Sequence, residues 1–185
     1  MVILGLVGYA GAGKDTAADA LPDFERVAFA DPLRAAAGAL FGLDMPVPPE
    51  RKTEPGPTGV SYRRGLQVLG TDVVRDQFST LFPELKWPSE EHWIHLLKAR
   101  LDPAKDYIVT DVRFLNEAHA IKAWGGTIVI IRGRKPDSND PHPSETGVQE
   151  IAQDWSLKSL YVVNDSTVEE LHTKMRDIAA LARDK

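Results

Sequence analysis

The feature that most constrains the fold is a glycine-rich stretch at residues 8–16, which reads GYAGAGKDT. It follows a short apolar run at residues 2–7 (VILGLV), which predicts a strand buried on both faces. Glycines let the backbone curl so that several N–H groups point at one anion, and a helix expected from Lys14 adds its positive dipole end. A strand, a G-x-x-x-x-G-K loop and a helix in this order predict a phosphate-binding loop.

The residue after the lysine is unusual, because Asp15 stands where a serine or threonine normally binds magnesium. An aspartate offers an anionic oxygen, which is also a hard ligand, and Thr16 is a hydroxyl close by. Two interpretations stay open. Asp15 binds the metal, directly or through a water, or it only stabilises a helix N-terminus, where acids are favoured.

Further along the chain, short apolar runs alternate with amphipathic segments. Strands are predicted at residues 2–7, 24–30, 107–111, 127–132 and 160–163, and helices at 14–21, 31–41, 62–77, 90–101, 116–124 and 167–183. Loops are predicted at 42–59, 78–89 and 133–147. This alternation predicts an α/β fold in which helices cover both faces of a five-stranded parallel sheet.

Polar residues that follow or end the predicted strands are expected to gather at one edge of the sheet, where ligands of such folds bind. They are the loop at Gly8, then Asp31, Asp111 and Arg132. Asp111 suits a Walker-B-like role, holding magnesium or its waters, and Arg113 follows two residues later. The alternative for Asp111 is a helix cap, and Asp31 is expected to cap the helix that begins at Pro32.

Phosphoryl transfer needs positive charge around both phosphates, so the arginines are the next candidates. Arg34 and Arg132 are the best of them, although a single arginine is more often a solvated surface residue. The polar loop 133–147 is expected to be a lid that excludes water, or else a surface connection. The aromatic residues Tyr62, Trp87 and Trp93 either stack on a base or pack against protein.

Composition narrows the functional classes. The 185 residues include no cysteine, so a disulfide framework or a cysteine zinc site is excluded, which fits a cytoplasmic location. No signal-peptide pattern is expected, and no apolar run approaches the ~20 residues that span a bilayer, so no membrane partner is expected. A net charge of −5 argues against nucleic acid as a partner, including the role of a DNA-binding ATPase.

A series of motifs resembles a known family. GYAGAGKDT, FADPLR, RRGLQVLGTD, YIVTDVRFLNEA, GGTIVIIR and SNDPHPSETG occur in this order over nearly the whole chain. Together they are similar to the deoxynucleoside monophosphate kinases of bacteriophages. The resemblance implies a three-layer P-loop kinase fold in one domain spanning residues 1–185, with an acceptor-binding insertion at about 37–66 and a lid at about 133–147. It also implies a homodimer.

The resemblance assigns roles to residues of this sequence. It implies that the phosphates of ATP are held by Gly11, Ala12, Gly13, Lys14, Asp15 and Thr16. It implies Mg²⁺ as cofactor, with Asp15, Thr16 and Asp111 as candidate ligands. The acceptor side would comprise Arg34, Arg63, Arg64, Gln67, Asp72 and Arg113, and the reaction centre Lys14, Asp111, Arg113 and Arg132.

The activity implied is transfer of the γ-phosphoryl group of ATP to a deoxynucleoside monophosphate. Two other hypotheses remain on the sequence alone: a P-loop kinase for another small metabolite, and a nucleotide sensor without catalysis. The phosphate loop would be the same in all three proteins. The hypotheses therefore differ only in their need for the acceptor-side arginines, Arg34 above all.

Overall fold

A computed structural model describes residues 1–43, 46–48, 51–133 and 143–184, with side chains left out at 143–145. The described chain divides into two compact units, each with its own packing. The first unit comprises Met1–Ala28 and Arg100–Lys185, and the second comprises Phe29–Ala99. The predicted insertion at residues 37–66 falls inside the second unit, which is larger than that range.

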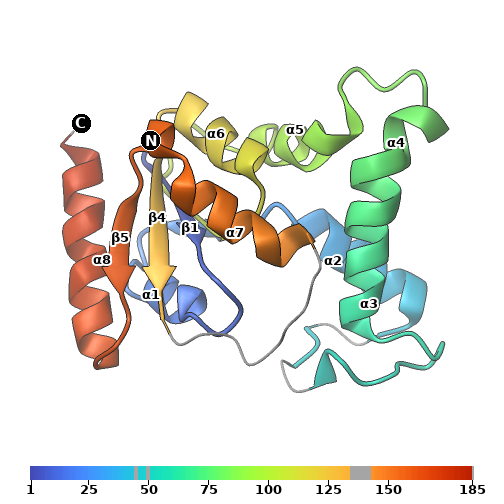
Figure 1. Ribbon diagram of the computed structural model, residues 1–185, viewed down its shortest axis with the longest axis horizontal. Coiled ribbons are helices and arrows are strands. Elements are labelled where there is room, and N and C mark those ends of the chain that lie inside the picture. Colours follow the sequence, from blue (N-terminus) through green and yellow to red (C-terminus); the bar gives the residue numbers. More distant parts are fainter. Residues whose placement is uncertain (44–45, 49–50, 134–142, 185) are drawn as a thin grey trace. The chain divides into compact units, whose positions relative to one another are not determined.

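A five-stranded parallel sheet forms the centre of the first unit (Figure 1). The strand order is β2-β3-β1-β4-β5, so β1 is the central strand, with β3 on one side of it and β4 on the other. This arrangement confirms the predicted α/β fold with a parallel sheet. The strands are β1 (Ile3–Val7), β2 (Glu25–Val27), β3 (Tyr107–Val112), β4 (Thr127–Arg132) and β5 (Leu160–Val163).

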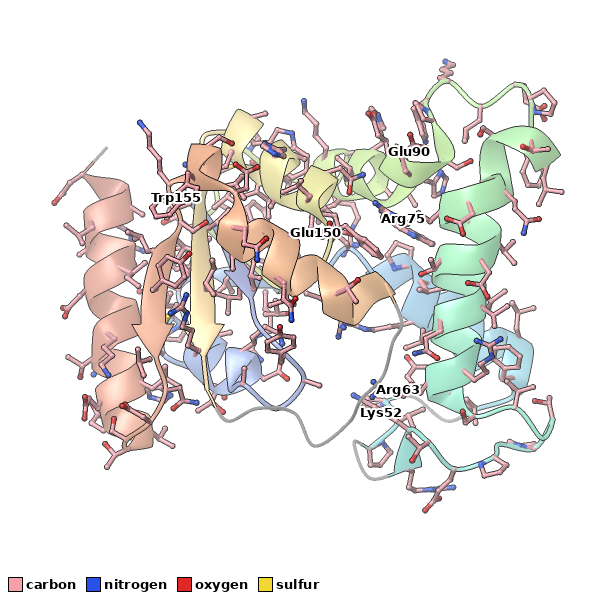
Figure 2. All side chains as sticks on the ribbon, viewed as in Figure 1. Lys52, Arg63, Arg75, Glu90, Glu150 and Trp155 are labelled. Carbon is pink, nitrogen blue, oxygen red and sulfur yellow. The ribbon has the colours of Figure 1, made fainter. Side chains whose placement is uncertain are left out.

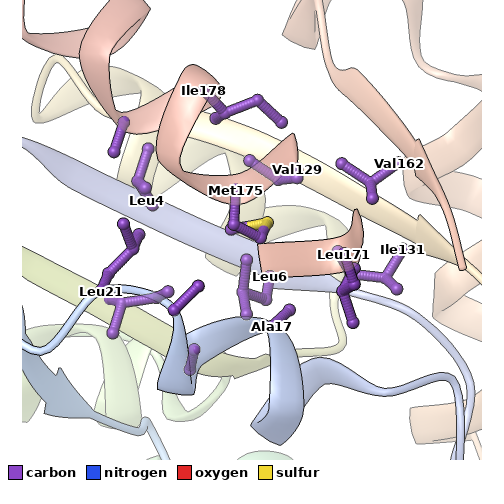
Figure 3. Packing of buried hydrophobic residues seen from close by; sticks show 14 of the residues in the cluster. Leu4, Leu6, Ala17, Leu21, Val129, Ile131, Val162, Leu171, Met175 and Ile178 are labelled. Carbon is purple, nitrogen blue, oxygen red and sulfur yellow. The ribbon is translucent and has the colours of Figure 1, made fainter. Parts of the chain in front are cut away.

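Four helices cover the two faces of this sheet, which explains why β1, β3 and β4 are almost wholly buried. On one face, α1 (Lys14–Asp19) and α8 (Val168–Arg183) pack on Leu4, Leu6 and Val129 in a single apolar cluster (Figure 3). The other face carries α6 (Leu115–Ala123) and α7 (Pro143–Gln153) (Figure 1). None of the helices in the described ranges is long and apolar enough to cross a membrane.

The helix α7 corrects the prediction that residues 133–147 form one loop. Gly147, which ends that predicted loop, lies inside the helix. A Cβ at this position would overlap the backbone carbonyl oxygen of Arg113, so the glycine permits a close approach of two backbones. The glycine that indicated a loop in the sequence therefore serves the packing of α7 against the Arg113 backbone.

The second unit is helical. Its elements are α2 (Asp31–Phe41), α3 (Tyr62–Gln67), a π-helical segment (Val68–Arg75), α4 (Asp76–Leu81), a 3₁₀ turn (Ser89–Glu91) and α5 (His92–Lys98). The α3, π and α4 segments run on without a break, so the helix predicted at 62–77 extends to Leu81. The predicted loop at 78–89 is correspondingly shorter.

Two glycines of this long helix lie close to α2, Gly65 in α3 and Gly70 in the π-helical segment. A Cβ on Gly65 would overlap the ring of Phe41, and a Cβ on Gly70 would overlap Leu33, so both glycines face α2. Trp93 Nε1 donates to the Gly70 carbonyl oxygen at 3.1 Å and supports this irregular turn.

The close approach at Gly147 can be tested by adding one methyl group. We expect Gly147→Ala to lower the free energy of unfolding by about 1–3 kcal/mol, because α7 or the Arg113 carbonyl must move. The midpoint of thermal unfolding should fall by ~2–4 °C per kcal/mol. Gln149→Ala, an exposed site on the same helix, is the control and should melt like the parent. Equal melting of both variants would show that the contact is not tight.

Candidate active site

The phosphate loop connects β1 to α1 and has the backbone that its sequence predicts. Gly11 and Gly13 adopt positive φ angles of 76° and 96°, in the left-handed region that glycine enters without strain. The Ala12 amide donates to the Tyr9 carbonyl oxygen at 3.1 Å, which tightens the curl. Gly13 then caps α1, which begins at Lys14, so the helix dipole points its positive end at the loop.

The side chain of Lys14 folds back across this loop. Its Nζ atom donates to the carbonyl oxygens of Gly8 at 2.6 Å and Tyr9 at 2.9 Å. The ammonium group is thereby held beside the backbone amides of the loop rather than in solvent. A mobile positive charge in this position can leave the carbonyls and meet the outer phosphates of a bound nucleotide.

The loop is fixed to the ends of β4 and β5. A Cβ on Gly8 would lie 2.8 Å from the Ile131 carbonyl oxygen, and a Cβ on Gly133 would lie 2.8 Å from that of Ala12. Backbone therefore packs directly on backbone on this side of the loop, and both glycines are required for it.

Asn164 completes this attachment and was not predicted as a site residue. It directly follows β5, and its Nδ2 donates to the Ala12 carbonyl oxygen at 2.9 Å while its backbone amide donates to the Arg132 carbonyl oxygen at 2.7 Å. A Cβ on Gly13 would overlap the same carboxamide. The only sequence signal was a polar residue at the carboxyl end of a strand, which carries no information about its partner 152 positions away.

Asp111 lies in β3, which is hydrogen-bonded to β1. The register between the strands shifts there, because two steps on β1, from Gly5 to Val7, match three steps on β3, from Val109 to Val112. Such an extra residue re-aims the side chains around it. Asp111 is only 6% exposed, and because Val7 pairs with Val112, its backbone lies beside the end of β1, where the phosphate loop begins.

The segment after Asp111 is held by a buried carboxylate, that of Glu117. Its Oε2 atom accepts the backbone amides of Arg113 at 2.8 Å and Phe114 at 3.0 Å, and the residue is 4% exposed. Hydrogen bonds to a charged acceptor are about twice as strong as neutral ones, so Glu117 fixes the backbone from which the Arg113 side chain extends. The acid at the third position of a helix is a recognisable cap, which the sequence analysis did not use.

Arg132 ends β4 and is exposed. Its guanidinium carbon lies 4.5 Å from the centroid of the Tyr161 ring, a cation–π contact. The Tyr161 hydroxyl in turn donates to the Ala152 carbonyl oxygen of α7 at 2.9 Å. Asp15, in the first turn of α1, is also exposed, whereas Thr16 is half-buried.

In the first unit, therefore, the sheet brings part of the predicted site to one edge. The phosphate loop, Asp111 and Arg132 all lie at the carboxyl ends of adjacent parallel strands, as expected. Arg113 follows on the segment that Glu117 holds. Residues 134–142 of the predicted lid lie outside the described residues.

All the predicted acceptor residues except Arg113 belong to the second unit. Arg34 Nη1 lies 3.0 Å from Asp31 Oδ1. Asp31 is therefore not the helix cap that was predicted: it is the first residue of α2, and its carboxylate pairs with Arg34 one turn later. Arg63, Gln67 and Asp72 are half-buried, and Arg64 is exposed.

Hydrogen bonds to backbone carbonyls hold the helix that carries Arg63, Arg64, Gln67 and Asp72, near its start and further along. The Arg63 amide donates to the Lys52 carbonyl oxygen at 2.8 Å, and Arg75 Nη1 donates to that of Glu90 at 3.2 Å; all four side chains are marked in Figure 2. The Ser61 hydroxyl caps the start of α3 by accepting the Arg64 amide at 3.3 Å.

The two tryptophans suggested for base stacking are engaged within the protein. Trp87 stacks on His95 with ring centroids 4.5 Å apart, and its Nε1 donates to His92 Nδ1 at 3.2 Å. Burial, and then the nearby His95, lower the pKa of His92, which favours the neutral ring that accepts this bond.

The role of Asn164 can be tested on the loop itself. We expect Asn164→Ala to expose the Ala12 carbonyl and to speed amide hydrogen exchange in the phosphate loop, with a loss of about 1 kcal/mol in unfolding free energy. Asp165→Ala, an exposed neighbour, serves as the control. Unchanged exchange in the Asn164 variant would mean that the carboxamide does not hold the loop.

Comparison with known proteins identifies the family of this chain. The family model for deoxynucleotide monophosphate kinase matches residues 54–175. The chain is 36% identical to a putative deoxynucleotide monophosphate kinase of Acanthamoeba polyphaga mimivirus over 188 residues, covering 95% of this chain and 94% of the relative.

Two phage proteins and one solved structure are also similar. The deoxynucleotide monophosphate kinases of Escherichia phage RB69 and Enterobacteria phage T4 are 29% and 30% identical over 64% and 63% of this chain, which spans 44% of each. A dephospho-CoA kinase from Campylobacter jejuni superposes over 97% of this chain and 96% of its own, with a TM-score of 0.43 and 11% identity. On the family model and the mimivirus relative, this chain belongs to the deoxynucleotide monophosphate kinase family.

Proposed function

We propose that the chain transfers the γ-phosphoryl group of ATP to a deoxynucleoside monophosphate, giving the diphosphate and ADP for DNA synthesis. The observation that carries this proposal is the arrangement at one sheet edge: a phosphate loop with Lys14 folded across it follows β1, and the neighbouring strand β3 carries the buried Asp111. Membership of the family supports a nucleotide as the acceptor.

The transfer is an in-line displacement without a covalent enzyme intermediate. The loop amides and Lys14 hold the ATP phosphates, and Lys14 balances the charge that develops on the transferred group. Arg34, Arg113 and Arg132 position donor and acceptor. The acceptor needs no general base, because its phosphate oxygen is already ionised near neutral pH.

The residues present fit magnesium. Within the described ranges no cluster of three or more His, Cys, Asp or Glu side chains could hold a metal by itself. Magnesium does not require one, since it usually takes one or two carboxylates together with phosphate oxygens and waters. Asp111 would supply a carboxylate, with Asp15 and Thr16 as further oxygen donors at the start of α1. When bound, Mg²⁺ would neutralise charge on the phosphates.

A coupled assay of ADP release tests the proposal, with ATP, magnesium and each of the four common deoxynucleoside monophosphates and their ribose counterparts. We expect turnover with at least one deoxynucleotide. Lys14→Ala should reduce it at least about a hundredfold, because one preorganised positive group at the transferred phosphate is lost. Circular dichroism of the variant controls for folding, since Lys14 also bonds two carbonyls.

The outcome separates the two alternative functions. Bound ATP without turnover of any nucleotide would contradict the proposal and favour a kinase for another metabolite or a nucleotide sensor. Arg34→Ala distinguishes a kinase from a sensor: a kinase loses acceptor turnover and retains ATP binding, whereas a sensor is indifferent to the change.

A further inference from the structure

An unpaired hydroxyl group is buried in the second unit, at the first residue of α3. Tyr62 is 3% exposed, and its phenolic oxygen has no hydrogen-bond partner within the part of the chain that the structure describes. Leaving a buried hydroxyl unpaired destabilises the folded chain. Most buried side-chain polar atoms have a partner, so an exception calls for an explanation, such as a ligand that is missing.

A positive charge, that of Arg34, acts on this hydroxyl. Burial raises the pKa of Tyr62, and the positive charge of Arg34 opposes that shift without reversing it. The phenol therefore stays protonated at neutral pH and can donate its hydrogen. Arg34 pairs with Asp31 at 3.0 Å, but its side chain is 39% exposed, so a ligand can reach the guanidinium beside that carboxylate.

The same burial argues against base stacking by Tyr62. A base needs an uncovered ring face, and a residue that is 3% exposed offers none. Packing of Phe41 against Gly65, one turn further along α3, shows that α2 already covers this part of the helix. Only the hydroxyl of Tyr62 is left without a function in packing.

We propose that Tyr62 is an acceptor-binding residue whose phenolic O–H donates to a phosphate oxygen of the nucleoside monophosphate, beside Arg34. This inference rests on the proposed function and adds a contact that recognises the phosphate rather than the base. Because the oxygen is covered in the unliganded chain, binding includes a local movement that uncovers it.

The substitution Tyr62→Phe removes this oxygen and nothing else. We expect KM for the deoxynucleoside monophosphate to rise about tenfold or more, as for loss of a hydrogen bond to a charged group, with KM for ATP unchanged. The midpoint of unfolding of the free protein should stay equal or rise, because an unpaired buried group has gone.

Two matched variants control for the loss of a buried hydroxyl. Tyr107→Phe removes a hydroxyl that accepts the Asp102 amide at 2.8 Å, and should lower the melting midpoint without a selective change in the acceptor KM. Ser159→Ala removes the other unpaired buried hydroxyl of the described residues, which lies in the first unit. It should change neither the KM for the deoxynucleoside monophosphate nor the KM for ATP.

A second readout does not require turnover: the rise in melting midpoint caused by a saturating deoxynucleoside monophosphate, compared with the nucleoside that lacks the phosphate. We expect Tyr62→Phe to reduce the stabilisation by the monophosphate only. An unchanged acceptor KM and an equal stabilisation in both proteins would overturn the inference. A lower melting midpoint with unchanged KM would instead assign the hydroxyl to a structural water.

The design separates this inference from the proposed function. If the parent protein turns over no monophosphate, the proposed function fails, and stabilisation by the monophosphate still reports on Tyr62. If the parent protein shows neither turnover nor stabilisation, both are overturned. If turnover is present and Tyr62→Phe changes nothing, only the inference fails.

Discussion

Close packing of the phosphate loop against the ends of β4 and β5 is the constraint on which the site depends. Backbone meets backbone at Gly8 and Gly133, and the carboxamide of Asn164 fills the space that a side chain at Gly13 would need. A loop held in this way has its backbone fixed by the protein's own contacts. Backbone dipoles that are fixed in advance need no rearrangement during a reaction, which makes them effective in catalysis.

The same sheet edge places acidic and basic groups in separate positions around the loop. β3 brings the buried Asp111 to one side of β1, whereas β4 brings the exposed Arg132 to the other. Two other residues hold neighbouring segments without a role in the reaction itself. Glu117 accepts the backbone amide of Arg113, and Tyr161 contacts the Arg132 guanidinium and donates to the Ala152 carbonyl of α7. The parallel topology thus places an acidic and a basic residue on the two strands that flank β1, an arrangement that the proposed phosphoryl transfer can use.

Local patterns in the sequence were sufficient for the sheet and for the phosphate loop. The bounds predicted for α2, β4 and β5 agree with the structure, because each is a short periodic run between clear breaks. The prediction failed where a residue serves a distant contact. Gly147 marks a close approach to Arg113 rather than a loop, and Gly70, in the π-helical turn at Val68–Arg75, marks a close approach to Leu33 of α2.

In the candidate site, too, residues with a local sequence pattern could be predicted and residues with distant contacts could not. Its loop residues are contiguous and could be recognised. Asn164 stands out only when its distant partner is known, and Tyr62, predicted to stack on a base or to pack, is drawn into the proposal only by its unpaired hydroxyl. The most direct test of the account is to follow label from the γ-phosphorus of ATP in the presence of a deoxynucleoside monophosphate and magnesium. Direct transfer predicts label in the deoxynucleoside diphosphate. Label that stays in ATP, or appears only as inorganic phosphate, would contradict it.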